Sequence, residues 1–207
     1  MIKQLLSLCF CLGLTAACTP IGVITTVGTT AGALSLEERG LEGAQRDYSL
    51  KANIVRKWAQ DDLLQVANLP VIVYDSKAMI LGSVDTEDQR AKIVARTWEV
   101  EGVKEVYNEI LLKEEWSLQD FAHDALIDAK LLAALTFDSD ILDLNYKYET
   151  EGGTVYVIGL AQSEAELKRF MAHAKSLPYV KRVISHVSVK PRQSLYRENP
   201  NSIKVAR

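Results

Sequence analysis

Two stretches of the chain, set 77 residues apart, decide the fold. The first is GSVDTEDQRAKIVARTWEVEGVKEVYNEILLK (82–113) and the second is GLAQSEAELKRFMAHAKSLPYVKRVISHVSVK (159–190). They align without a gap and share seven of 32 residues, paired as Gly82/Gly159, Glu87/Glu164, Ala95/Ala172, Val103/Val180, Lys104/Lys181, Val106/Val183 and Lys113/Lys190. This period indicates an internal repeat of one small structural unit.

Both copies have the same order of local signals. An apolar run, 78–81 or 155–158, ends at the aligned glycine. A helix start follows in each, because Thr86 with Gln89 and Ser163 with Glu166 match the capping-box pattern. Apolar residues then recur at helical spacing, at Ile93, Val94, Thr97 and Val100 in one copy and at Leu167, Phe170, Met171, Ala174 and Leu177 in the other. Alternating strands over 106–112 and 183–189 end the copies.

The residues before each glycine complete the unit. Residues 50–67 and 117–135 are predicted helices, and each leads into a hairpin, 71–81 with a turn at 75–77 and 142–158 with a turn at 151–153. We expect one face of the second helix to carry Phe121, Ala125, Leu132 and Leu135. The predicted fold class is α/β, more narrowly α+β. It comprises two tandem αββαβ domains, each a three-stranded mixed sheet with two helices packed on one face.

The N-terminus has the pattern of a secretory signal. Lys3 precedes an apolar run over 5–14, which is too short to span a bilayer, and small residues lead to Cys18. The run Leu14-Thr15-Ala16-Ala17-Cys18 resembles the lipobox of bacterial lipoproteins, although Thr15 stands where leucine is commonest. The resemblance implies cleavage between Ala17 and Cys18, with a diacylglycerol and an N-acyl chain on Cys18. The alternative is an ordinary secreted protein cut after Ala17.

The predicted organisation is a signal peptide over 1–17, a lipid-anchored tether over 18–46, domains over 47–114 and 117–190, and a basic, disordered tail over 191–207. Cys18 is the only cysteine after the cleavage site, so it has no partner for an internal disulfide. The net charge of −3 for the whole chain argues against a nucleic-acid partner.

The run Gly82-Ser83-Val84-Asp85-Thr86-Glu87, followed by Gly102-Val103-Lys104-Glu105-Val106-Tyr107-Asn108, resembles the BON domain. The second copy keeps Gly159, Val180 and Val183. It departs where Tyr179 and Ser185 replace the family glycine and asparagine, and we expect Pro178 to make the turn there. Two such domains behind a lipobox resemble dual-BON outer-membrane lipoproteins. The resemblance implies a periplasm-facing protein that supports outer-membrane integrity, with no catalytic residues and no cofactor.

In that family the second domain is associated with anionic phospholipid, and its first helix is the proposed membrane-facing element. Here Asp120, Asp124 and Asp128 recur along that helix, and we interpret them as a solvated acidic face rather than a carboxylate site. Anionic headgroups would repel such a face. The phospholipid-binding candidates are therefore the basic residues Lys168, Arg169, Lys175, Lys181 and Arg182, with Leu126, Ile127 or Trp116 as apolar anchors. The alternative is core packing and ordinary surface charge.

No enzyme motif is recognised. His123, His173 and His186 lie in no metal-binding or nucleophile pattern, and we expect His173 on a solvated helix face. Thr19 rather than aspartate follows Cys18, which favours the outer membrane under the common lipoprotein sorting rule. The predicted function is a lipid-anchored module that binds membrane phospholipid. The alternative is an adaptor for an envelope protein partner.

Overall fold

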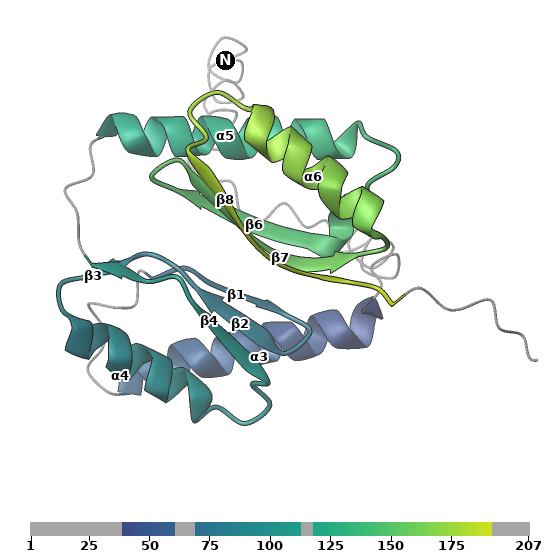
Figure 1. Ribbon diagram of the computed structural model, residues 1–207. Helices are drawn as coiled ribbons and strands as arrows, with labels where there is room; N and C mark the ends of the chain where they lie inside the picture. Colours follow the sequence, from purple (N-terminus) through teal and green to yellow (C-terminus); the bar gives the residue numbers. More distant parts are fainter. Residues whose placement is uncertain (1–38, 61–68, 113–117, 192–207) are drawn as a thin grey trace, which may run out of the picture. The chain divides into compact units, whose positions relative to one another are not determined.

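The computed structural model describes residues 39–60, 69–112 and 118–191 (Figure 1). All described residues belong to one compact unit, which spans 34–207. The predicted lipidation site at Cys18, the cleavage site at Ala17 and the tail from residue 192 lie outside the described residues.

The first repeat follows the predicted αββαβ order. Helix α3 (Gly40–Gln60) leads to strands β1 (Val71–Tyr74) and β2 (Lys77–Ile80), then to helix α4 (Glu87–Trp98) and strand β4 (Glu105–Asn108). The strand order is β1-β2-β4, with β1 antiparallel and β4 parallel to β2. Two short strands, β3 (Ser83–Val84) and β5 (Leu111–Leu112), form a separate parallel pair. Helix α3 begins ten residues before the predicted start.

The second repeat has the same topology with longer strands. Its elements are helix α5 (Leu118–Thr136), the short 3-10 helix η2 (Asp143–Asn145), strand β6 (Tyr146–Glu151), strand β7 (Thr154–Ala161), helix α6 (Glu164–Ser176) and strand β8 (Arg182–Val189). The strand order is β6-β7-β8, again with one antiparallel and one parallel pairing. Both helices cover the same face of this sheet (Figure 1). The prediction of two α+β domains, each with a mixed three-stranded sheet, is confirmed.

The predicted caps differ in one respect. Thr86 forms the full capping box, because it accepts from the amide of Gln89 and the Gln89 side chain reaches back to the amide of Thr86. Ser163 likewise accepts from the amide of Glu166. The carboxylate of Glu166, however, accepts from the amides of Leu142 and Gln162. It therefore ties the loop before β6 to the start of α6.

Each repeat has its own hydrophobic core between its helices and its sheet. The inner face of α3 is made of Asp47, Leu50, Ile54 and Trp58, and the residues 77 positions later, Asp124, Ile127, Leu131 and Leu135, make the inner face of α5. The repeat therefore extends back over the first helices. All members of the hydrophobic clusters lie between Leu50 and Val189, so a protein spanning 34–207 keeps every one of them.

A buried aspartate pins the hairpin turn in each repeat. The Asp47 carboxylate accepts from the amides of Asp75 at 2.7 Å and Ser76 at 2.8 Å. Asp124 accepts from the amides of Gly152 at 2.7 Å and Gly153 at 2.8 Å. All four turn residues have positive φ, from 48° to 79°, as a two-residue hairpin loop requires.

A third cluster joins residues of both repeats. It contains Tyr74, Met79 and Leu81 together with Tyr156 and Ile158. Polar contacts lie around it: the Gly82 amide donates to the Glu151 carboxylate at 2.8 Å, and the Lys77 ammonium donates to the Ser188 hydroxyl at 3.1 Å. His186 Nε2 lies 2.7 Å from a carboxylate oxygen of Glu109, and its ring stacks on Tyr107.

Candidate functional site

Helix α5 turns a different face to the core than its sequence predicts. Of the four apolar residues expected on one face, only Leu135 is buried, whereas Phe121 is 58 % and Leu132 is 54 % exposed. The expectation was wrong because apolar residues occur all round this helix, so their spacing does not define one inner face.

The acidic stripe also points the other way. Asp124 is only 6 % exposed and holds the hairpin turn. Asp128 is half-buried and accepts from the Thr150 hydroxyl at 2.6 Å, and burial raises its pKa to about 6 despite that hydrogen bond. Asp120, half-buried, lies one turn before Asp124. The interpretation of these aspartates as a solvated acidic face was therefore wrong. The repulsion of anionic headgroups that was expected from such a face is no longer an argument against membrane contact by α5.

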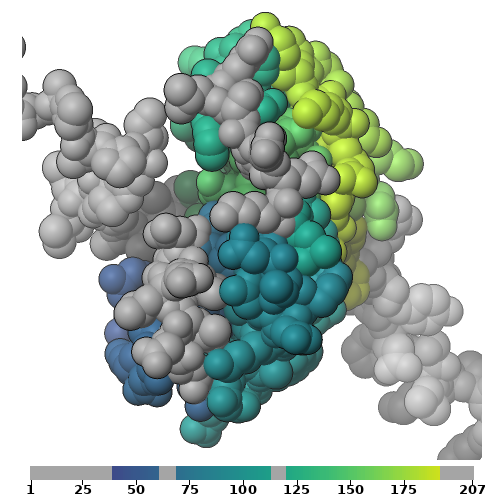
Figure 2. Space-filling view, turned by 90° about the vertical axis from the view of Figure 1, so that its left-hand side faces the viewer, coloured from purple at the N-terminus to yellow at the C-terminus, as the bar shows by residue number. Residues whose placement is uncertain are grey.

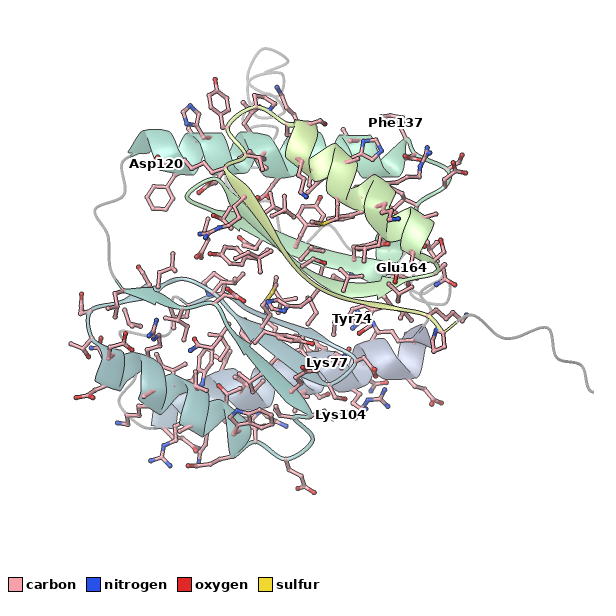
Figure 3. All side chains as sticks on the ribbon, in the orientation of Figure 1. Tyr74, Lys77, Lys104, Asp120, Phe137 and Glu164 are labelled. Carbon is pink, nitrogen blue, oxygen red and sulfur yellow. The ribbon has the colours of Figure 1, made fainter. Side chains whose placement is uncertain are left out.

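The outward face of α5 is apolar. A stripe of residues at helical spacing runs along it, Leu126, Lys130, Ala133 and Phe137, the last just beyond the helix end. Leu126 is 39 % and Phe137 is 89 % exposed, and Figure 3 shows Phe137 at the end of α5, on the side away from the sheet. The neighbouring positions of this face include Ala122, Ala125 and Ala129, all exposed. Lys130 is the only charged residue on the outward face over residues 120–136.

The first repeat shows that the fold does not require this face. The stripe positions of α3, 77 residues earlier, hold Ser49, Asn53, Arg56 and Gln60. These four positions are thus polar in the first repeat and, apart from Lys130, apolar in the second. Helix position alone therefore does not account for the exposed apolar residues of α5, and exposed apolar surface of this kind marks interaction sites.

The predicted basic residues lie near α5 but have different environments. Lys168 and Lys175 are exposed, seven residues apart on one face of α6, which packs beside α5. Lys181 and Arg182 are exposed at the start of β8. Arg169 is bound by acids instead: its guanidinium donates to Asp138 at 3.0 Å and lies 3.3 Å from Asp140. Among the described residues, no acidic side chain forms a salt bridge with Lys168, Lys175, Lys181 or Arg182.

An ion-pair cluster fixes the loop after Phe137. Besides Arg169, His173 Nε2 lies 2.6 Å from the Asp138 carboxylate. Hydrogen bonds from Arg169 and then from His173 hold the pKa of Asp138 well below its usual range. The expectation that His173 lies on a solvated face was wrong, because its side chain is two-thirds buried in this pair. The cluster keeps the chain beyond α5 close to α6.

Both αββαβ repeats match one known domain family. The BON domain matches residues 46–114 and again residues 123–191. This chain belongs to the BON-domain family. The two matches together cover most of the chain, and each spans one observed repeat.

Several curated proteins are similar to this BON-domain chain. An uncharacterized protein of Anaplasma centrale is 37 % identical over 125 residues, covering 60 % of this chain and 83 % of that protein. The outer membrane lipoprotein DolP of Haemophilus influenzae is 24 % identical, covering 77 % of this chain and 75 % of its own length. The 21 kDa hemolysin of Actinobacillus pleuropneumoniae is 27 % identical and covers 78 % of each chain.

The second BON domain departs from the first at the turn before its last strand. Gly102 in the first domain has φ of +95°, and Tyr179, its counterpart 77 residues later, has φ of +70°. The prediction that Pro178 makes this turn is confirmed: Pro178 and Tyr179 are its two central residues, the Val180 amide donates to the Leu177 carbonyl across it, and Tyr179 takes the left-handed conformation. That conformation costs a non-glycine residue about 1–2 kcal/mol. The Tyr179 ring stacks on His123 at 3.8 Å between centroids.

Among residues 39–60, 69–112 and 118–191, no three His, Cys, Asp or Glu side chains gather where they could hold a metal ion. None of the helices in those ranges is long and apolar enough to cross a bilayer. Sequence reasoning missed Phe137 and the apolar stripe of α5, and a comparison with α3 at the 77-residue offset could have found both.

Proposed function

We propose that this protein is a lipid-anchored, periplasm-facing BON-domain protein of the outer membrane that contacts anionic phospholipid through the outward face of α5. One observation carries the proposal: the stripe Leu126, Lys130, Ala133 and Phe137 is exposed and apolar except for one cation, whereas the same stripe of α3 is polar. A helix that exposes one apolar face can bury that face at the membrane interface without crossing the bilayer.

The size of the contact fits reversible binding. Full burial of a Leu or Phe side chain contributes about 1.5–3 kcal/mol. Scaled by the exposed fractions of Leu126 and Phe137, burial in lipid contributes roughly 3 kcal/mol. Lys130, Lys168 and Lys175 add about 1 kcal/mol each where they approach anionic headgroups. A contact of this strength is weak alone and effective for a protein already tethered to the membrane.

The tether is the predicted lipid on Cys18. A relative named as an outer membrane lipoprotein supports this part of the proposal, and so does the lipobox pattern. Metabolic labelling with a palmitate analogue tests it: the wild type is expected to take up label, and Cys18→Ser is expected to take up none. Equal labelling of the two proteins would contradict lipidation at Cys18.

The membrane contact is tested on a protein spanning residues 34–207, which lacks the anchor. Co-sedimentation is measured with vesicles of phosphatidylglycerol and phosphatidylcholine and with vesicles of phosphatidylcholine alone. We expect binding to the anionic vesicles, reduced at least tenfold by Leu126→Glu. Ser49→Glu, at the equivalent position of α3, is the matched control and is expected to bind as the wild type does. Equal sedimentation with both vesicle types, or equal effects of the two variants, would contradict the proposal.

A second candidate, an adaptor for an envelope protein partner, is favoured by one cleft. A cavity of about 790 Å³ is lined by residues of α3, β1 and β6, among them Leu41, Tyr48, Ile72 and Tyr148. Tyr48 is 77 % exposed, and exposed aromatic residues are enriched at protein interfaces. Cross-linking in cells from position 44, in the same lining, would favour this candidate if it recovered one stoichiometric envelope protein, and Tyr48→Ala would then abolish that cross-link.

A further inference from the structure

The turn after α6 contains a strained residue at a position where the first domain has glycine. Tyr179 has φ of +70°, and the same turn in the first domain has glycine, Gly102, with φ of +95°. Glycine takes this conformation without steric cost, whereas a tyrosine there is held against a backbone preference. Such strain persists only where the surroundings hold it, and it is concentrated at functional positions.

The side chain that causes the strain is placed at the surface. The Tyr179 ring is 51 % exposed, and one of its faces stacks on the imidazole of His123 at 3.8 Å and an interplanar angle of 9°. The first domain has Arg46 and Gly102 at these two positions, so the stacked pair belongs to the second domain alone. The stacked rings join the turn after α6 to the first part of α5, on the side of the molecule that Figure 2 shows.

The pair continues the apolar stripe of α5. His123 precedes Leu126 by three residues and Lys130 by seven, so the three lie along one side of the helix. From His123 to Phe137 the helix rises about 20 Å. The stripe therefore has an aromatic group at each end, Tyr179 on His123 at one and Phe137 at the other. A tyrosine ring with an apolar body and a polar tip is suited to the headgroup level of a bilayer.

We propose that Tyr179, positioned by His123, is a second membrane anchor that works with Phe137 to hold α5 parallel to the bilayer surface. The inference rests on the proposed function, since it concerns the same membrane contact. It adds a residue outside α5 and an orientation. One anchored end would let the helix pivot, whereas two anchors about 20 Å apart fix its long axis in the plane of the membrane.

Tyr179→Gly distinguishes a role of Tyr179 in folding from a role in membrane binding. Glycine relieves the backbone strain, which affects stability, and removes the ring, which affects vesicle binding. In a protein spanning 34–207, Tyr179→Gly is expected to unfold at the same or a higher urea concentration than the wild type. Its affinity for phosphatidylglycerol vesicles is expected to fall three- to tenfold. Tyr179→Phe, which keeps the ring, should retain most of the affinity. Trp98→Ala removes an exposed aromatic side chain from the first domain and should leave the affinity for phosphatidylglycerol vesicles unchanged.

A fluorescent label on residue 179 reports directly whether this residue enters the membrane. All cysteines of the chain precede residue 34, so Tyr179→Cys and Tyr48→Cys each offer one thiol for an environment-sensitive dye. The dye at 179 is expected to brighten and shift to the blue on vesicles, and the dye at 48 is not. Vesicle binding by Tyr179→Gly equal to wild type, while Leu126→Glu fails to bind, would overturn this inference alone. Failure of the wild-type protein to bind vesicles would overturn the proposed function as well.

Discussion

Replacing Asp124 with alanine should destabilise the second domain far more than an exposed aspartate would. The carboxylate accepts two backbone hydrogen bonds, at 2.7 and 2.8 Å, from the amides of Gly152 and Gly153. Hydrogen bonds to charged groups contribute about 1.5–3 kcal/mol each, and the amides left behind lose their acceptor. The expected loss is about 3–5 kcal/mol in the free energy of unfolding. For a protein of this size the thermal midpoint should fall by roughly 10 °C.

The assay is urea unfolding of the protein spanning 34–207, followed by far-ultraviolet circular dichroism. Asp124→Asn retains one carbonyl oxygen and should lose about half as much. Asp47→Ala, the equivalent change in the first domain, should resemble Asp124→Ala, and Asp88→Ala on the exposed face of α4 is the control. A loss below about 1 kcal/mol for Asp124→Ala would refute the reasoning, since it would make Asp124 an ordinary surface acid.

Two further changes test the packing of the second domain. Burial raises the pKa of Glu151 to about 7 from 4.5, so the fold favours its protonated form, and stability should fall as pH rises from about 4.5 to 7. Glu151→Gln should remove up to about 3 kcal/mol of that fall, as measured by urea unfolding at pH 4 and pH 8, and an unchanged pH profile would contradict it. Gly159→Ala should cost at least about 2 kcal/mol, because a Cβ there would lie 2.2 Å from the backbone oxygen of Asn145. Wild-type stability of this variant would show that β6 moves aside freely.

The architecture could be predicted because the repeat shows the same order of helix and strand signals twice in the sequence. The capped helices and alternating strands agree between the copies, and the residues expected to line α4 and α6, such as Ile93 and Phe170, are buried. The buried faces of the first helix in each repeat, α3 and α5, were harder to predict. Helix α5 carries apolar residues on both its buried and its exposed face, so periodicity selected the wrong one. The turn-binding role of Asp124 depends on a partner 28 residues away, which no local pattern records.

The candidate site was predicted only in part. The second domain and Leu126 were identified, but the basic residues could not be ranked, because the pairing of Arg169 with Asp138 depends on tertiary structure. The strain at Tyr179 was invisible for a related reason. Pro178 identifies the turn correctly, but the positive φ that this turn requires at the next position falls on a tyrosine, which sequence patterns do not associate with it.

The central claim is that α5, and not its counterpart α3, faces the membrane. The most direct measurement is nuclear magnetic resonance of the protein spanning 34–207 on bicelles containing phosphatidylglycerol, with and without a nitroxide-labelled lipid. Signals from Leu126, Lys130, Ala133 and Phe137 are expected to be attenuated, and those from Ser49, Asn53, Arg56 and Gln60 are expected to be unaffected. Attenuation that is equal in the two sets, or stronger in the α3 set, would contradict the account.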